Sequence, residues 1–500
     1  MVVLAAVAVG SLVLFRALTG SPSVAESPET PTGELLNAQH AENVTLAYPT
    51  YLGGPRRESG GRPPGPDSLD LVWKVEIGAG TTARVSDGRL VYWSGTGWTG
   101  QPTLTYDGGR PWLVIGGYDH GLRRIAADTG EVAWRTALDD VIKGTNTVYY
   151  EPTRPQGDRL VVVTGSRRGN GLALGDPAIA PLRAFAFSSG EEIWRLPVPR
   201  TACYSQDVDA SPLRIDGHLI VALEPGYVLA LDTAHLVPGP GGHPMPSVVT
   251  TSPLLYAPED VLTRAGRQGS NVVLEGSPAL LGDRIYIASS AGHVYGLNRS
   301  TLAIEWDFVA GGDLDSTAVV TPDGRLLVGM ERQYVDHGGV YMLDPGRTPE
   351  DAVVWFFPTK DAGIGEWGGG VVGSVAIHPS APLAAFCSVD GNVYVVRTDV
   401  TDGESPDPSS SATLPRPVLV FQDDIGGSIS TPVFVGDRMV AAGLDRTVHL
   451  YRVIAEGSDY ELEEMDTFIA EGPFESTPLV WDGRVYIGCR DGYLYCLGSR

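Results

Sequence analysis

One stretch of the sequence, residues 281–308 (LGDRIYIASSAGHVYGLNRSTLAIEWDF), restricts the fold more than any other. Alternating apolar and polar residues within it, broken by glycine- and asparagine-containing turns, predict three strands at 284–289, 293–297 and 303–308. A fourth strand precedes them at 277–280. Four such strands make one antiparallel sheet, which is only marginally stable alone. We therefore expect this sheet to be one copy of a repeat.

The same hairpin recurs along the chain. Regular copies lie at 217–231, 324–343, 382–396, 436–453 and 483–497, and stretched or irregular ones at 112–134 and 157–194. A short pair of residues, often ending in proline, marks the strand ahead of most copies: Ser211-Pro212, Ser277-Pro278, Thr317-Ala318, Ser374-Val375, Thr431-Pro432 and Thr477-Pro478. Proline is tolerated at the first position of a strand but not inside a ladder. An all-β repeat of about 40 to 60 residues predicts a β-propeller, here with eight four-stranded antiparallel blades.

The two ends of the chain predict three regions. Residues 1–25 are apolar and offer a small-residue cleavage site at 23–25, which indicates a signal peptide or membrane anchor. Residues 26–68 are rich in Pro, Ser, Glu and Gly and predict a flexible tether, followed by the propeller at 69–500. We therefore expect the propeller to lie outside the cytoplasmic membrane.

Three segments depart from the repeat. The last repeat ends without an outer strand, so we expect residues 69–77 to pair with the terminal sheet and close the propeller. Residues 81–109, around Trp93 and Trp98, form an irregular insertion. Residues 401–416 (TDGESPDPSSSATLPR) predict a disordered surface loop.

The composition excludes some classes of function. The net charge is −24 and no basic stripe offsets it, which argues against nucleic-acid binding and favours cations or a basic partner. The four cysteines are spaced in a way that disfavours a disulfide framework. The sequence contains no nucleophile elbow and no phosphate-binding loop. The histidines have no metal-ligand spacing, and three fall in predicted strands, where a histidine satisfied within the sheet is the simplest interpretation: His218, His293 and His449.

Acidic residues gather in the loops that join an outer strand to the next inner strand. In a propeller these loops meet on one face around the central channel. The candidate ligand- or cation-binding residues there are Asp207, Asp209, Glu275, Asp313, Asp315, Glu366, Trp367, Asp423, Asp424 and Glu475. Converging carboxylates suit a hard cation such as calcium, or a basic peptide. The alternative interpretation is that they are ordinary solvated loop acids.

A tryptophan motif links the repeat to a known family. Residues 126–134 (AADTGEVAW) resemble the tryptophan-docking repeat of the pyrroloquinoline-quinone (PQQ) propeller superfamily, and residues 188–194 and 300–306 are weaker copies. The resemblance covers residues 69–500. It implies that five tryptophans form the core between blades: Trp73, Trp134, Trp194, Trp306 and Trp355.

The resemblance carries two functional expectations. Quinone-dependent alcohol dehydrogenases of this superfamily hold the quinone between a tryptophan and a vicinal disulfide, with calcium on Glu and Asn and an Asp as general base. Trp367 lies in a suitable loop and Asp313 or Asp315 could imitate the base, but the chain has no adjacent cysteine pair. The repeat is closest in kind to the propeller proteins of outer-membrane β-barrel assembly, which implies a scaffold.

We therefore expect a non-catalytic, extracytoplasmic scaffold that needs no cofactor. It would bind a protein partner or a small ligand at a propeller face, and it would contact a membrane only through the N-terminal segment. The alternative is a PQQ- and calcium-dependent dehydrogenase that acts on an alcohol or sugar. A ligand-sensing ectodomain is a third class, and the sequence encodes no output module for it.

Overall fold

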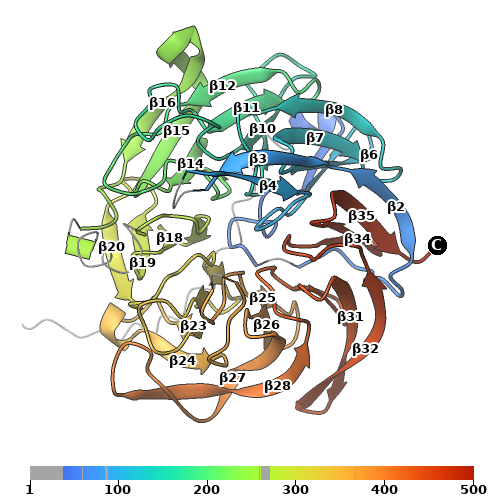
Figure 1. Cartoon of the computed structure of the whole chain (residues 1–500), viewed down its shortest axis with the longest axis vertical. Coiled ribbons are helices and arrows are strands. Elements are labelled where there is room, and N and C mark those ends of the chain that lie inside the picture. Colours follow the sequence, from blue (N-terminus) through green and yellow to red (C-terminus); the bar gives the residue numbers. More distant parts are fainter. Residues whose placement is uncertain (1–37, 59, 85–87, 258, 261–270, 366) are drawn as a thin grey trace, which may run out of the picture.

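The computed structural model of the chain describes residues 38–58, 60–84, 88–257, 259–260, 271–365 and 367–500. Over these residues the chain forms an eight-bladed β-propeller, as the repeats predict (Figure 1). Seven blades are four-stranded antiparallel sheets, and blade 1 has a fifth strand. Two short 3-10 turns, η1 (Pro240–Gly242) and η2 (Pro349–Asp351), interrupt the strands.

Blades 1 to 4 follow the chain from the inner strand outward. Their strands are β1 (Val44–Tyr48), β5 (Thr103–Asp107), β6 (Arg110–Gly116), β7 (Gly121–Ala126) and β8 (Val132–Ala137) in blade 1; β9 (Thr147–Tyr150), β10 (Leu160–Thr164), β11 (Leu182–Ala186) and β12 (Glu192–Leu196) in blade 2; β13 (Leu213–Ile215), β14 (His218–Leu223), β15 (Tyr227–Pro238) and β16 (Pro244–Thr251) in blade 3; and β17 (Ala279–Leu281), β18 (Arg284–Ser289), β19 (His293–Asn298) and β20 (Ile304–Val309) in blade 4.

Blades 5 to 7 repeat this order, and blade 8 combines the two ends of the propeller. Their strands are β21 (Val319–Val320), β22 (Leu326–Met330), β23 (Gly339–Leu343) and β24 (Val353–Pro358) in blade 5; β25 (Ala376–Ile377), β26 (Leu383–Cys387), β27 (Asn392–Pro406) and β28 (Thr413–Asp424) in blade 6; β29 (Val433–Val435), β30 (Arg438–Ala442), β31 (Thr447–Glu456) and β32 (Asp459–Ile469) in blade 7; and β33 (Leu479–Trp481), β34 (Arg484–Gly488), β35 (Tyr493–Gly498) and β2 (Leu71–Glu76) in blade 8. In blade 8, β2 pairs antiparallel with β35, with Val75 opposite Leu494.

The docking tryptophans connect neighbouring blades. Four of them donate the indole N–H to a backbone carbonyl of the next blade: Trp73 to Ala127 (3.2 Å), Trp134 to Phe187 (2.9 Å), Trp306 to Arg347 (3.0 Å) and Trp355 to Thr398 (3.5 Å). Trp194 is 1 % exposed and packs in the core between blades 2 and 3. All five indoles therefore bury apolar area between blades, and four of them also satisfy the polar N–H in the neighbouring blade.

The Thr-Gly step of the motif has a packing reason. Gly130 and Gly190 have φ values of 76° and 75°, in the left-handed region that favours glycine. A Cβ atom at Gly190 would lie 2.8 Å from the ring of Trp134, and one at Gly130 would lie 3.0 Å from the ring of Trp73. At these two positions the tryptophan ring of one blade therefore packs directly against the glycine of the next blade, which leaves little room for a side chain.

Hydroxyl side chains link the starts of the inner strands. Five consecutive links join a backbone N–H of one blade to the Oγ of the next at 2.8–3.4 Å: Ser211 to Ser277, Ser277 to Thr317, Thr317 to Ser374, Ser374 to Thr431 and Thr431 to Thr477. We call these six residues the hydroxyl ring. They are the same positions that mark the inner strands in the sequence. Because the polar groups are buried, pairing them around the axis removes a desolvation cost in the blades that the ring links.

The segment predicted as a tether is built into the propeller from residue 38 onward. Strand β1 adds a fifth strand to blade 1 by pairing with β5. Tyr51, Leu52 and Arg57 are fully buried near the axis, where a blue loop crosses the middle of Figure 1. The guanidinium of Arg57 donates to the carbonyls of Ser211 and Pro278 at 3.1 and 2.8 Å. The Pro-, Ser-, Glu- and Gly-rich composition of this segment therefore did not reveal the residues that bind it to the propeller. Residues 1–37, which include the predicted signal or anchor, lie outside the described residues.

Two other predicted irregular segments contain regular structure. Residues 401–416 were expected to be disordered, but β27 and β28 extend through most of them as a long hairpin, with Glu404 opposite Pro415. Within 81–109, β3 (Ala79–Ala83) and β4 (Leu90–Ser94) form a separate hairpin that lies across the central part of the view in Figure 1. The four cysteines are buried and unpaired. Among the described residues, no helix has the length and apolar character needed to cross a membrane.

Candidate functional site

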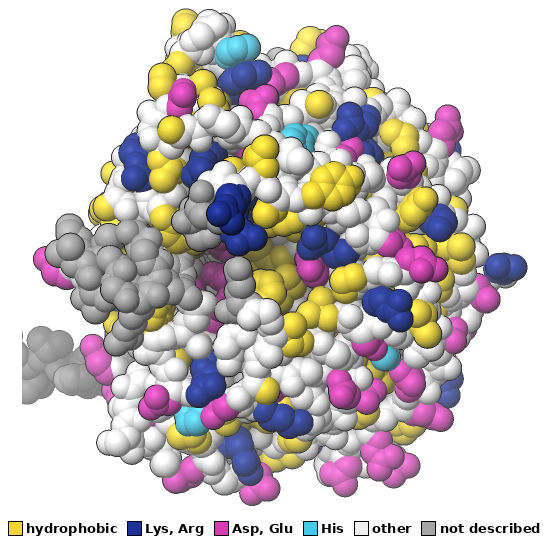
Figure 2. Space-filling model, viewed as in Figure 1, with side chains coloured by type: hydrophobic (Ala, Val, Ile, Leu, Met, Phe, Trp, Pro, Cys, Tyr) yellow, Lys and Arg dark blue, Asp and Glu magenta, His cyan; other side chains and the backbone are white. Residues whose placement is uncertain are grey.

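Seven carboxylates from consecutive blades form one electrostatically connected group, which we call the axial cluster: Asp207, Asp209, Glu224, Glu275, Asp313, Asp315 and Glu331. They come from the connections β12–β13, β14–β15, β16–β17, β20–β21 and β22–β23. Figure 2 shows the same face as Figure 1, where acidic and apolar side chains meet near the centre. The propeller thus turns residues far apart in sequence into one acidic site.

Two cations neutralise one side of the axial cluster. The ammonium of Lys143 pairs with Asp209 and lies 3.9 Å from Glu275. Arg167 donates from Nε to Asp207 Oδ2 at 2.7 Å, and the backbone N–H of Arg168 donates to the other oxygen at 2.9 Å. Asp207 is therefore fully satisfied, whereas Asp209 and Glu275 share one lysine.

The other side of the cluster has polar but uncharged partners. Asn271 donates from Nδ2 to Asp313 Oδ2 at 2.5 Å, and Ser290 donates to Asp315 Oδ1 at 2.9 Å. Gln333 donates to Glu331 Oε2 at 3.0 Å. In these three contacts the carboxylates accept hydrogen bonds from uncharged side chains only.

Several buried oxygens of the cluster have no donor. Asp209 Oδ1, Glu224 Oε1 and Asp313 Oδ1 are shielded from solvent, and no described residue donates a hydrogen bond to any of them. All three residues are at most 2 % exposed. An unpaired buried carboxylate oxygen carries a desolvation penalty of about 1–3 kcal/mol or more. These oxygens are therefore the strongest sign that the cluster is built to receive a positively charged group or a proton.

The protonation of the cluster follows from burial and crowding. Burial raises the pKa of Glu224 well above its usual range, and the neighbouring Asp209 and Asp207 raise it further. The pKa of Glu275, Asp313 and Glu331 is raised in the same way, with burial as the main cause. Burial also raises the pKa of Asp209, although Lys143 opposes the shift. Without a cation, burial and the mutual repulsion of the carboxylates therefore favour the protonated form in part of this group.

Three of the carboxylates are close enough to share one metal ion. One oxygen each from Asp209, Glu224 and Glu275 lies within 4.8 Å of the other two. Calcium binds carboxylate oxygens at about 2.3–2.6 Å, so two ligands on opposite sides of the ion can be about 5 Å apart. The trio therefore has the dimensions of a hard-cation site, with Lys143 as the present counter-charge.

Aromatic residues and the β3–β4 hairpin cover the cluster. Trp98 is buried, and its ring centroid lies 5.6 Å from Lys143 Nζ. Arg167, which holds Asp207, also donates to Thr82 Oγ1 and to the carbonyl of Ala83 in β3, both at 2.9 Å. Arg167 therefore links the insertion around Trp93 and Trp98 to the axial cluster. Where this insertion keeps water out, the electrostatic interactions between the groups beneath it are stronger.

The remaining sequence-predicted residues lie elsewhere or have local partners. Asp423 accepts from the hydroxyl of Tyr451 at 2.9 Å, and Asp424 caps its own turn by accepting from the N–H of Gly426. Glu475 pairs with Arg490 at 2.6 Å. Trp367 is half-buried in an apolar group with Trp98, Val372, Val389 and Ile429. Glu366 lies outside the described residues.

Sequence reasoning missed four functional groups of the cluster: Lys143, Glu224, Asn271 and Glu331. It considered only the loops from an outer to an inner strand, whereas Glu224 and Glu331 occupy hairpins between the second and third strands of their blades. A signal was present at Glu224-Pro225-Gly226, because a charged residue follows directly on the buried apolar run LIVAL of β14. Carboxylates are almost never fully buried without a reason.

The residues present fit a quinone cofactor poorly. Asn271, Asp313 and a nearby glutamate, Glu275, reproduce the residue types that the superfamily uses for calcium and for the base. The four buried cysteines are separate, so the vicinal disulfide that covers the quinone has no counterpart. Trp367 packs into an apolar group rather than against the cluster residues. PQQ is itself a tricarboxylate, and seven carboxylates against two cations would repel it.

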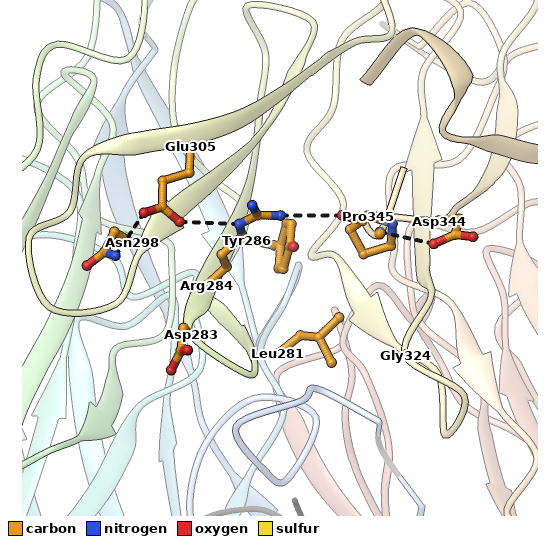
Figure 3. A pocket seen from close by; sticks show the side chains of 10 residues that line it. Leu281, Asp283, Arg284, Tyr286, Asn298, Glu305, Gly324, Asp344 and Pro345 are labelled. Atoms are coloured by element: carbon orange, nitrogen blue, oxygen red, sulfur yellow. Dashed lines mark hydrogen bonds and ion pairs between the residues drawn. The ribbon is translucent and has the colours of Figure 1, made fainter. Parts of the chain in front are cut away.

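A pocket between blades 4 and 5 is separate from this site (Figure 3). It has a volume of about 560 Å³ and is lined by residues such as Arg284, Glu305 and Pro345. Arg284 donates to Glu305 at 3.3 Å and to the carbonyl of Pro345 at 3.4 Å. Arg284, Glu305 and the carbonyl of Pro345 therefore satisfy one another's hydrogen bonds. In these contacts no polar group is left to bind a ligand, so we describe the pocket as a groove between two blades.

Comparisons with known proteins agree on the fold. No protein-family model matches the sequence, and no curated protein matches it significantly. BamB from Moraxella catarrhalis is 14 % identical, with a TM-score of 0.50 over 85 % of this chain and 100 % of its own. Quinohemoprotein alcohol dehydrogenase from Comamonas testosteroni is 12 % identical, with a TM-score of 0.57 over 94 % of this chain and 82 % of its own.

The computationally designed Ika8 protein is 11 % identical, with a TM-score of 0.51 over 81 % of this chain and 98 % of its own. The chain therefore has the fold of the PQQ-like propellers. At these identities the likeness extends to the fold alone, and the fold occurs in an alcohol dehydrogenase and in a designed protein alike. Function must be argued from the site.

Proposed function

We propose that the protein is a non-catalytic, extracytoplasmic binding protein that holds a positively charged ligand in the axial cluster. The observation that carries the proposal is the set of buried carboxylate oxygens without donors on Asp209, Glu224 and Asp313. Buried polar groups in folded proteins are nearly always paired, with protein groups, water or an ion. A cation bound by Asp209, Glu224 and Glu275 would compensate the oxygens of Asp209 and Glu224.

Calcium is the probe ion that fits the trio best. Asp209, Glu224 and Glu275 provide only oxygen ligands, which hard cations prefer. A bound divalent ion would take over the counter-charge that Lys143 now provides to Asp209 and Glu275. The lysine is about one-fifth exposed, so its ammonium has solvent to move toward.

The proposed location rests on sequence and fold together. The apolar N-terminal segment predicts export, with residues 1–25 either removed or kept as an anchor. This segment is also the only part of the chain for which we propose membrane contact. A protein partner would dock on the propeller surface, with the cation site as a structural or ligand-bearing centre.

Isothermal titration of calcium into the full chain tests the proposal. We expect saturable binding to the wild type and at least tenfold weaker binding to Glu224→Gln. Glu475→Gln is the matched control, because Glu475 is a loop acid already paired with Arg490. No heat with calcium, or equal binding by both variants, would reject the cation site and leave the carboxylates as protonated acids.

A second candidate function is a quinone- and calcium-dependent dehydrogenase. The specific observation in its favour is the Asn271–Asp313 hydrogen bond, because Asp313 is thereby oriented with one free oxygen, as a general base requires. The test is absorbance and dye-linked alcohol oxidation after adding PQQ with calcium. Oxidation that is lost in Asp313→Asn would favour the enzyme; calcium binding without oxidation would favour the binding protein.

A further inference from the structure

A second group of metal-ligating side chains lies between blades 6 and 7, away from the axial cluster. Asp423 on β28, His449 on β31 and Glu464 on β32 each offer one ligand atom, and these atoms all lie within 4.8 Å of one another. Strands β28 and β32 are adjacent across the blade boundary. Three different strands therefore bring one imidazole and two carboxylates to one point.

The histidine of this group is held in a fixed orientation. Its ring stacks on Tyr451 with an interplanar angle of 12°. Nε2 lies 3.1 Å from Asp445 Oδ2, and Nδ1 lies 2.8 Å from Glu464 Oε1. Metal-binding histidines commonly donate the N–H of the second ring nitrogen to an outer carboxylate, which fixes the tautomer and leaves the first nitrogen for the metal. Asp445 is placed for that role.

The second carboxylate, Asp423, is also oriented. The hydroxyl of Tyr451 donates to its Oδ2 at 2.9 Å and the backbone N–H of Asp424 donates to its Oδ1 at 2.9 Å, so both oxygens are held in place and each keeps a second lone pair for a metal ion. His449 is buried, Asp423 is half-buried and Glu464 is exposed. An ion could therefore enter from the Glu464 side and reach a nitrogen ligand that is protected from solvent.

A second histidine provides an internal comparison. His293 on β19 of blade 4 stacks on Tyr295 at 4° and contacts Asp307 at 2.8 Å. Its position in the blade differs by two residues, because it pairs with Ser289, the sixth residue of β18, whereas His449 pairs with Ala441, the fourth residue of β30. His293 belongs to no metal-ligating group among the residues that the structure describes. A stacked histidine with one carboxylate therefore occurs outside such a group, whereas His449 contacts two carboxylates.

We propose that Asp423, His449 and Glu464 bind one divalent transition-metal ion of the zinc class. Nitrogen with carboxylate oxygen is a ligand set that zinc takes, and three protein ligands leave the fourth position for water. Zinc binds its ligand atoms at about 2.0–2.2 Å, which places two tetrahedral ligands roughly 3.4 Å apart. The 2.8 Å contact between His449 Nδ1 and Glu464 Oε1 must therefore open, and wider separations in the group, up to 4.8 Å, must close. Glu464 is exposed and can supply that movement.

The ligand set separates this site from the axial cluster. The assignment does not depend on the axial cluster, whose oxygen-only ligands favour a different class of ion.

Equilibrium dialysis of the full chain against zinc, with bound metal counted by mass spectrometry, tests the proposal. We expect His449→Gln and Glu464→Gln to lose one bound zinc or to bind it at least tenfold more weakly. His293→Gln and Glu224→Gln should keep it. The exposed Glu464→Gln variant keeps the test decisive if His449→Gln fails to fold. No zinc on the wild type, or equal loss in the His293 and His449 variants, would overturn the proposal.

Discussion

The hydroxyl of Tyr51 lies 2.9 Å from Thr431 Oγ1, although the two residues are 380 positions apart in the sequence. The same hydroxyl donates to Ser374 at 3.3 Å, so Tyr51 joins two consecutive members of the hydroxyl ring. Arg57 reaches the ring from the other side through the carbonyl of Ser211. The N-terminal segment is therefore a structural part of the propeller axis.

Arg57→Met should destabilise the fold strongly. The substitution keeps an apolar chain of similar length but leaves the buried carbonyls of Ser211, Pro278 and Tyr51 without donors. At about 1–3 kcal/mol for each unpaired group, we expect a loss of roughly 3 kcal/mol or more in the free energy of unfolding. Tyr51→Phe should cost about 1 kcal/mol. Urea unfolding measures the free energy of unfolding of both variants. If neither variant loses stability relative to the wild type, the segment is not anchored to the propeller.

Gly190→Ala should cost more than Gly217→Ala. Both glycines have φ of 75°, so both substitutions carry the same left-handed strain of about 1–2 kcal/mol. At Gly190 the new Cβ would also lie 2.8 Å from Trp134, whereas at Gly217 nothing lies within 4 Å. The difference between the two unfolding free energies measures the close contacts at Gly190, with the Trp134 ring and with Thr136 Oγ1, both at 2.8 Å. Equal losses would mean that the tryptophan does not depend on the glycine.

The stability of the metal-free protein should fall as the pH rises above about 5. Burial raises the pKa of Glu224 and its neighbours, so the folded state keeps protons that the unfolded chain has released above about pH 4.3. This stabilising contribution is complete below the unfolded pKa and is lost as the pH rises through the folded pKa. Thermal melts with a chelator, from about pH 5 to about pH 9, measure it.

Glu224→Gln provides the control for that pH dependence. The amide cannot ionise, so the variant should gain stability relative to the wild type as the pH rises, and the gain should disappear when calcium is added to the wild type. A pH profile that is identical for the two proteins would show that Glu224 is not protonated in the folded state.

Lys143→Met should increase the affinity of the axial cluster for calcium. The ammonium now pairs with Asp209 and lies 3.9 Å from Glu275, and it must give way to a divalent ion. Removing it leaves two carboxylates without a counter-charge, so we expect calcium to bind at least tenfold more tightly. Without calcium the variant should be less stable, because a buried charge has lost its partner. Calcium affinity that stays unchanged would place the ion elsewhere.

Sequence reasoning recovered the fold because its signals are local. A short hydroxyl or proline pair precedes the inner strand in six blades, as at Ser211, and five blades carry a docking tryptophan, as at Trp194. In two of these blades a positive-φ glycine lies four residues before the tryptophan, as at Gly190. The sequence did not predict the long hairpin of β27 and β28, because its Pro, Ser and Gly content favours a loop. The antiparallel pairing of the two strands outweighs that preference. The axial position of Arg57 was missed because its partners are carbonyl groups, which no sequence pattern marks.

The candidate site was only partly accessible from sequence. The structure brings Asp207, Asp209, Glu275, Asp313 and Asp315 together, because consecutive loops of a closed propeller converge. Glu224 and Glu331 come from hairpins whose depth depends on strand length and stagger, which are tertiary properties. His449 and Glu464 become neighbours only through the register of β31 with β32, where a bulge shifts the pairing.

Terbium luminescence tests the central claim most directly. Terbium takes the oxygen ligands of calcium, and a nearby indole sensitises its emission; Trp98 lies beside Lys143 at the cluster. We predict saturable emission from the wild type that calcium displaces, loss of emission in Trp98→Phe with calcium binding retained, and loss of both in Glu224→Gln. His449→Gln should behave as the wild type. Emission that persists in Glu224→Gln, or none from the wild type, would contradict a cation site at the propeller axis.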